Sequence, residues 1–302
     1  MANTIAGSNI AAISRAGFEA FKDMLAPISA FSTNFSDEVR QPSESVATRI
    51  FPSNSAASFA SDYTDSPDNV LTGVTVTLNQ NKFTNFHITD TEQSKTPVDL
   101  MAGFAREAGY GLAKDIIDYT LGLVLAATYG DTANDKVTVS AAAFDVDDVI
   151  DGIEKALTNK KWGSGSIILN YAYAAALMKD NAIKDASAFG TSGSAAPIQS
   201  GRVGTLFGFP VYTYPVPGNS ENLTGMIVNP AALAVAVRPM TAIAADGMGS
   251  TVSEVVTDAD SGLSLGFRMF YEDESGRLFG AYHALYGAIA AQSTGIVRIV
   301  SA

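Results

Sequence analysis

The sequence predicts an α+β fold, and three observations carry that prediction. Residues 96–130 have the periodicity of one long helix, which we expect to span about 97–129. An extended ribbon is expected before it at 45–92, where apolar and polar residues alternate. Residues 240–302 contain four strand-like stretches. A chain of 302 residues is long enough to bury a large core between such elements.

The long helix has a well-marked start and an unusual number of glycines. Thr96 is a good N-cap, Pro97 suits the first turn, and Asp99 places an acid near the positive end of the helix dipole. One apolar stripe contains Met101, Ala105, Ala108, Leu112, Ile116, Tyr119 and Leu123. Each glycine inside a helix costs about 1 kcal/mol relative to alanine. We therefore expect the glycines to lie where another backbone approaches, from this chain or from a neighbouring copy; they are Gly103, Gly109, Gly111 and Gly122.

Residues 1–44 predict one amphipathic helix that begins near Ser8 and ends at Pro27. Its apolar face has no partner within the segment, so it docks either on the body of the chain or on a neighbouring copy. Acidic and basic residues balance along it, which argues against a basic arm that binds DNA.

The ribbon at 45–92 predicts two extended runs around a polar loop. The first run is 46–51, and the second continues from Val74 past Leu78 to Ile88. A two-stranded ribbon is only marginally stable alone in water, so we expect it to lie on the body or across another subunit. His87 is out of phase with its apolar neighbours, which indicates a surface or interface side chain.

The middle of the chain mixes strands and helices. We expect strands at 137–139, 167–169, 212–217, 225–228 and 234–237, helices at 145–157 and 172–179, and a loop of small residues at 186–200. Asp145, Asp147, Asp148 and Asp151 lie at a helix start, where the helix dipole favours acids, so we interpret them as helix-start residues and not as metal ligands. The glycine run at 201–211 lacks the Gly-Lys-Ser/Thr of a phosphate-binding loop.

The tail predicts strands at 252–256, 263–272, 278–286 and 296–300, with a turn at 273–276. Six aromatic residues are expected to fill the core under the long helix: Phe267, Phe270, Tyr271, Phe279, Tyr282 and Tyr286. His283 lies among them and is expected to be a histidine satisfied within the sheet.

Composition excludes several classes of function. The formal net charge is −12, and no cluster of Lys and Arg is present, which argues against a nucleic-acid reader. The absence of cysteine excludes thiolate catalysis and disulfides, and two histidines cannot form a His-rich metal site. No run of about 20 apolar residues is present to span a membrane, and charged residues interrupt the only candidate signal peptide. We therefore predict no catalytic, cofactor-binding or metal-binding residues.

The order of these pieces resembles the major capsid proteins of tailed bacteriophages, which have the Hong Kong 97-type fold. An arm and a ribbon precede a spine-like helix, and a mixed block then contains Gly204-x-x-x-Gly208-x-Pro210-Val211, which is similar to a turn-plus-strand element of that family. The resemblance implies an N-arm at 1–44, an E-loop at 45–92, a P-domain from 93–140 and 240–302, and an A-domain at 141–239. It also implies that 186–200 points toward a five- or six-fold axis.

The resemblance implies a structural protein, not an enzyme, that self-assembles into an icosahedral phage head enclosing double-stranded DNA. The implied partners are copies of the chain itself in hexamers and pentamers, scaffolding and portal proteins, a decoration protein, and DNA held without sequence readout; a membrane is not implied. The implied location is the virion, assembled in the cytoplasm of a host bacterium. Three alternatives stay open: an encapsulin-like compartment shell, a secreted β-rich adhesin, and an uncharacterised soluble enzyme, for which Asp258, Asp260 and the acids of 145–151 are the only acidic candidates.

Overall fold

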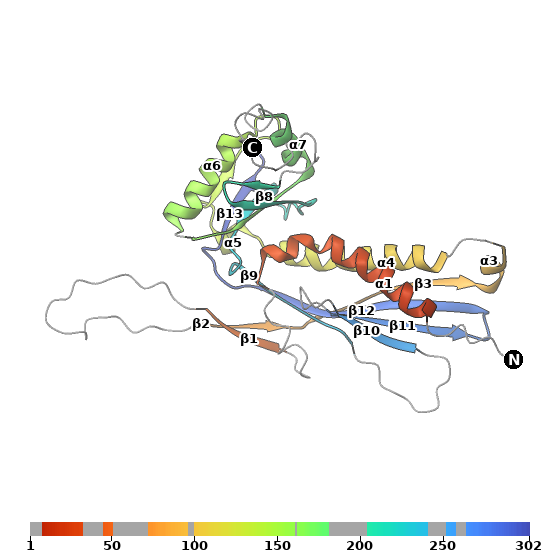
Figure 1. Cartoon of the computed structure of the whole chain (residues 1–302). Helices are drawn as coiled ribbons and strands as arrows, with labels where there is room; N and C mark the ends of the chain where they lie inside the picture. Colours follow the sequence, from red (N-terminus) through yellow and green to blue (C-terminus); the bar gives the residue numbers. More distant parts are fainter. Residues whose placement is uncertain are drawn as a thin grey trace.

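A computed structural model describes residues 8–32, 45–50, 72–95, 100–160, 162–180, 204–240, 252–257 and 264–302. Its helices are α1 (Ser8–Met24), α3 (Asp90–Lys95), α4 (Leu100–Leu121), α5 (Ala126–Tyr129), α6 (Val146–Glu154) and α7 (Tyr171–Lys179). Figure 1 shows α1 and α4 side by side over one sheet, with a second sheet and its own helices beyond one end of this pair. The predicted α+β class is confirmed.

The first sheet is antiparallel and lies under α1 and α4. Its strands are β3 (Gln80–Thr89), β9 (Leu233–Arg238), β10 (Val252–Thr257), β11 (Ser264–Glu272) and β12 (Arg277–Ala290). The order is β10-β11-β12-β3, and β9 pairs with the far end of β12. Side chains of a strand alternate between two faces, so one set faces the helices and the other faces away.

The aromatic residues of the tail are divided by that alternation. Phe267, Tyr282 and Tyr286 are buried against the helices, as predicted. The prediction is wrong for Phe270 and Tyr271, which are 39% and 36% exposed, and for Phe279, which is only half-buried and lies on the other face. Phe270 lies on the opposite face from Phe267 and stacks there on Phe279, with ring centroids 5.1 Å apart. Strand periodicity explains why Phe270 and Phe279 lie outside the core. Tyr271 shares the parity of Phe267 but lies near the exposed end of β11, where its hydroxyl donates to Asp90.

The long helix is shorter than predicted. α4 ends at Leu121, residues 122–125 form a turn and an extended link, and α5 then adds a single turn. The interruption is stabilised by distant side chains, because Asn219 Nδ2 donates to the carbonyls of Leu121 (2.9 Å) and Val124 (3.0 Å). These bonds satisfy carbonyls that a helix end leaves without partners. The predicted start at 96–99 lies outside the described residues.

We expected each of the four glycines of the long helix to lie where another backbone approaches. Within this chain, that is confirmed at one of the four positions. A Cβ on Gly109 would lie 2.1 Å from the carbonyl oxygen of Gly17, so α1 and α4 touch backbone to backbone there. Gly122 meets no other segment of this chain, since its close neighbours are carbonyls of its own helix end, so approach by a neighbouring copy stays a prediction there. Gly103 has open space around it, and Gly111 meets only a methyl group of Thr84 at 3.8 Å. For these two, approach by a neighbouring copy stays a prediction.

The N-terminal helix docks on its own chain, which settles one open alternative. Ile13, Phe21 and Ile28 of α1 and the following turn are buried in the same core as α4. The buried hydroxyl of Tyr282 donates to the carbonyl of Ile13 at 3.0 Å, so a hydrogen bond connects β12 of the sheet to α1.

The ribbon consists of β1 (Ser45–Ile50) and β2 (Thr72–Thr77), paired antiparallel. Its base lies on the body, because Val76 and Leu78 pack with Ala234 and Ala236 of β9. This contact is on the face of the first sheet that points away from α1 and α4. Residues 51–71 between the two strands lie outside the described residues.

The second sheet has six strands in the order β4-β13-β8-β5-β7-β6. They are β4 (Lys136–Thr138), β5 (Ser166–Leu169), β6 (Thr205–Leu206), β7 (Phe209–Thr213), β8 (Leu223–Val228) and β13 (Ile296–Val300). β6 and β7 form a hairpin whose central residues, Phe207 and Gly208, both have positive φ, as in a type I′ turn. The described part of the glycine run, 204–211, therefore contains a hairpin, whereas residues 201–203 and the predicted loop at 186–200 lie outside the described residues.

The last strand of the tail, β13, belongs to the second sheet, where it pairs with β8 and β4. Ile296 and Val300 face the core that contains α4, while Val297 and Ile299 face a second core under α6 and α7. A strand buried on both faces suits a continuous apolar run, which explains the sequence Ile-Val-Arg-Ile-Val.

Candidate assembly surfaces and the junction between the sheets

The acids at 145–151 act as a helix start. The Asp145 carboxylate accepts the N–H of Asp148 at 3.1 Å, and the Asp148 carboxylate accepts the N–H of Asp145 at 3.2 Å. This reciprocal pair is a capping box, which satisfies two N–H groups that the helix leaves free. Across the part of the chain that the structure describes, no three metal-binding side chains gather, and Asp258 and Asp260 lie outside that part.

Both histidines lie on the face of the first sheet that points away from the helices. His87 is exposed, as predicted, and its ring lies 5.3 Å from that of Phe279. His283 is half-buried within the sheet and lies 5.7 Å from the ring of Phe83. Burial lowers the pKa of His283, and the charge of Arg268 lowers it further.

We expect His283 to make the folded subunit sensitive to mild acid. Its pKa is lower in the folded chain than the ordinary value of 6.5, so the unfolded chain binds a proton more readily. Stability should therefore fall as the pH drops below about 6.5 toward the folded pKa, and His283→Phe should lose less stability over that interval. Urea unfolding of both chains between pH 7.5 and 5 measures this, with proton NMR of the two histidines to follow the titration. Equal losses in both chains would contradict it.

The same face carries apolar surface that nothing in the described residues covers. Phe83 is 61% exposed and Phe270 is 39% exposed. The base of the ribbon covers only the part of this face near β9 and the far end of β12. Large exposed apolar patches mark interaction sites on protein surfaces. This face is therefore a candidate assembly surface.

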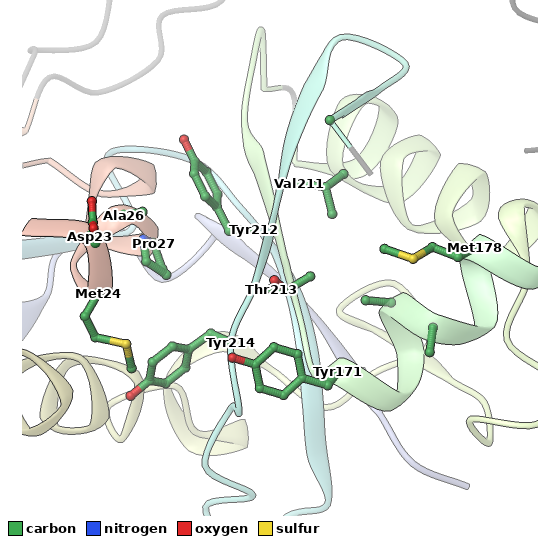
Figure 2. A pocket seen from close by; sticks show the side chains of 13 residues that line it. Asp23, Met24, Ala26, Pro27, Tyr171, Met178, Val211, Tyr212, Thr213 and Tyr214 are labelled. Carbon is green, nitrogen blue, oxygen red and sulfur yellow. The ribbon is translucent and has the colours of Figure 1, made fainter. Parts of the chain in front are cut away.

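A groove of about 720 Å³ lies between the end of α1 and α7. Figure 2 shows Met24 and Tyr214 near one end of it and Met178 and Val211 near the other, with Tyr171 between them. The lining residues offer one carboxylate, Asp23, and no nucleophile paired with a base. The groove is thus a mainly apolar surface feature with no arrangement for acid–base chemistry among these residues.

A cluster of charged residues lies where the second sheet meets the break between α4 and α5. Arg298 of β13 is 1% exposed, and its guanidinium donates to Glu221 Oε2 and Asp131 Oδ1, each at 2.6 Å. Lys136 Nζ donates to the same Asp131 oxygen at 2.9 Å. The hydrogen bond from Lys136 and the nearby charge of Arg298 lower the pKa of Asp131. We call Asn219, Glu221, Asp131 and Arg298 the Arg298 junction.

Sequence reasoning missed this junction, although one signal was present. Arg298 is a single charged residue between Ile and Val on both sides, and such a residue needs partners if the strand is buried. The partners themselves come from segments about 80 and 170 residues away and could not be named in advance.

Solved phage structures resemble this arrangement along most of the chain. A protein of Mycobacterium phage Che8 is 17% identical, covers 89% of each chain and has a TM-score of 0.54. The capsid asymmetric unit of cyanophage Pam1 gives 13% identity over 89% of this chain and 87% of that one, with a TM-score of 0.56. This chain has the Hong Kong 97-type capsid fold. The mature capsid of bacteriophage PhiM1 agrees, with 13% identity, 86% and 82% coverage and a TM-score of 0.53.

The likeness agrees with the resemblance stated from the order of elements in the sequence. No protein-family model matches the sequence, and neither does any curated protein. At identities of 11–17%, what is shared is the path of the backbone. Within the described residues, no helix is long and apolar enough to cross a membrane. The alternatives of a compartment shell, an adhesin or an enzyme gain no support from these likenesses.

Proposed function

We propose that this chain is a structural major capsid protein, whose copies assemble into an icosahedral phage head that encloses double-stranded DNA. The observation that carries the proposal is the likeness to phage capsid structures over 86% and 89% of this chain, for PhiM1 and Pam1. Assembly of this kind needs buried surface and correct geometry, and no side chain has to take part in a reaction.

The proposal divides the chain into four parts. Residues 1–44 are the N-arm, 45–92 the E-loop, 93–140 with 240–302 the P-domain, and 141–239 the A-domain. Within this division the β1–β2 ribbon is the element that reaches a neighbouring copy, since α1 is already buried on its own chain. Stable protein interfaces bury about 1,200–2,000 Å², which extended ribbons and an open sheet face together readily provide.

The exposed side of α4 is a second proposed contact. Phe104 and Tyr110 are each 45% exposed there, and Gly103 lies nearby with open space around it. A neighbouring backbone over this side would explain two glycines that otherwise only weaken the helix.

The proposed partners follow from the role. Copies of the chain form hexamers and pentamers, and scaffolding, portal and decoration proteins complete the head, which assembles in the cytoplasm of a host bacterium. The net charge of −12 suits a shell that encloses DNA without binding its phosphates tightly.

Sedimentation velocity and negative-stain microscopy of the purified chain test the proposal. We expect capsomers or closed shells to appear as concentration rises, with or without an added scaffolding protein. A chain that stays strictly monomeric at high concentration, with scaffolding protein also supplied, would contradict it.

A further inference from the structure

The Arg298 junction is the place where the break after α4 meets the second sheet. Arg298 lies on β13 between Ile296 and Val300, both of which pack in the core that contains α4. Its guanidinium is thus a charged group within an otherwise apolar contact between the second sheet and the core that contains α4. Its two carboxylate partners come from the loop before β8 and from the segment between α5 and β4.

One short loop connects Arg298 to the helix break. Glu221 accepts from Arg298 and, with the same oxygen, from the backbone N–H of Ala126 at 2.7 Å, the first residue of α5. Two residues earlier, Asn219 donates to the last carbonyl of α4 and to that of Val124. The helix end, the start of α5 and the centre of β13 are therefore held by the same five residues, 218–222.

The backbone of this loop is held in an uncommon conformation. Asn219, Ser220 and Asn222 have φ values of 49°, 59° and 54°, in the left-handed region that residues other than glycine rarely adopt. Such conformations persist only where surrounding contacts determine them, and they gather at sites that must hold a particular shape. Here the determining contacts are those to α4, α5 and β13.

The rest of α4 is fixed independently. Tyr286 of β12 donates to the Asp115 carboxylate, and Tyr214, just after β7, donates to the Asp118 carboxylate at 2.7 Å. Beyond Leu121, two buried side chains make directional contacts: Tyr129 of α5 donates to the carbonyl of Ala232 at 3.0 Å, and Arg298 donates to Glu221 and Asp131. Of the two, only the Arg298 contact involves the loop 218–222, which also holds the end of α4 and the start of α5.

We propose that the Arg298 junction fixes the angle between α4 and the six-stranded sheet and thereby determines the curvature of the assembled shell. This inference rests on the proposed function. A closed assembly forms only where the rotation between neighbouring subunits closes, and the angle between α4 and the six-stranded sheet sets how the surfaces of each subunit face its neighbours. The Arg298 guanidinium is buried, so moving it away from its carboxylates would leave an unpaired buried charge, which is costly.

The first test uses the unassembled subunit. Arg298→Met removes both ion pairs while keeping a long side chain, and Arg15→Met is the matched control on the exposed side of α1. Hydrogen exchange should become about tenfold faster or more at 122–126 and 218–223 in Arg298→Met, while the centre of α4 keeps its protection. The control should match the wild type. Unchanged exchange in Arg298→Met would contradict a junction that holds the angle.

The second test uses assembled particles. Electron microscopy should show wild-type shells of one diameter, and Arg298→Met should give several diameters, tubes or open sheets. Uniform shells of wild-type diameter from Arg298→Met would contradict this inference alone. A wild-type chain that forms no particles would instead contradict the proposed function.

A second pair of variants keeps the test decisive if Arg298→Met does not fold. Asn219→Gly removes the two bonds to the helix end but permits the same φ, and Asn222→Gly makes the same change at a similar φ, 54°, beside it. Asn219→Gly should broaden the range of particle diameters, whereas Asn222→Gly should not. Identical particles from both variants would overturn the proposal.

Discussion

Replacing Gly109 with alanine is expected to destabilise the folded subunit by about 2 kcal/mol, as overpacked sites typically do. The new Cβ would lie 2.1 Å from the Gly17 carbonyl oxygen and 2.9 Å from its carbon. These are backbone atoms of α1, so no side chain can rotate away and the whole helix must move. This cost exceeds the gain of about 1 kcal/mol that alanine brings to a helix interior. Urea unfolding of the unassembled subunit, followed by circular dichroism, measures the difference.

Gly103→Ala in the same helix is the matched control. Nothing lies within 4 Å of the position that its Cβ would take, so only the change in helix propensity applies. The unassembled subunit should become more stable, by up to about 1 kcal/mol. If Gly109→Ala and Gly103→Ala stabilise the subunit equally, α1 does not pack against Gly109, and the contact between α1 and α4 described above is wrong.

The second large effect is expected at the base of the ribbon. A Cβ on Gly287 of β12 would lie 2.0 Å from the Thr77 carbonyl oxygen, at the end of β2. Gly287→Val should therefore push the ribbon off the sheet, at a cost of about 1–3 kcal/mol in subunit stability. The ribbon is the element proposed to reach a neighbouring copy, so the change should weaken every contact that it makes in the shell. A loss of about 1.4 kcal/mol in binding free energy at each contact lowers its association constant tenfold, so we expect shell yield to fall at least about tenfold. Sedimentation of equal amounts of folded subunit measures that yield.

Gly73→Val provides the comparison within the ribbon itself. Gly73 lies in β2 with open space around it, and valine is a favourable strand residue, so the ribbon should stay in place. Its shells should form as in the wild type. Normal assembly of folded Gly287→Val would show that the position of the ribbon base does not matter for assembly.

Local patterns in the sequence predicted most elements of the fold, because periodicity records which face of an element is buried. The strands of the tail and the helix after Asp145 follow from residues within a few positions of one another. Gly103 and Gly109 look alike in sequence, yet only Gly109 contacts a backbone of this chain. The difference depends on where α1 docks, which no local pattern contains.

The end of the long helix could not be predicted for the same reason. Gly122 was visible as a weak point, but the groups that stabilise the break are Asn219 and Glu221, nearly 100 residues further along the chain. Arg298 likewise was visible as a charge within an apolar strand, whereas its partners were not. Tertiary contacts therefore decide both the length of the helix and the junction between its end and the second sheet.

A cryo-electron microscopy reconstruction of particles formed by the purified chain tests the central claim most directly. We predict a closed icosahedral shell in which each subunit has the fold described above and each β1–β2 ribbon extends onto a neighbouring copy. Subunits that remain separate, or that associate only into aggregates without closed symmetry when scaffolding protein is supplied, would contradict it.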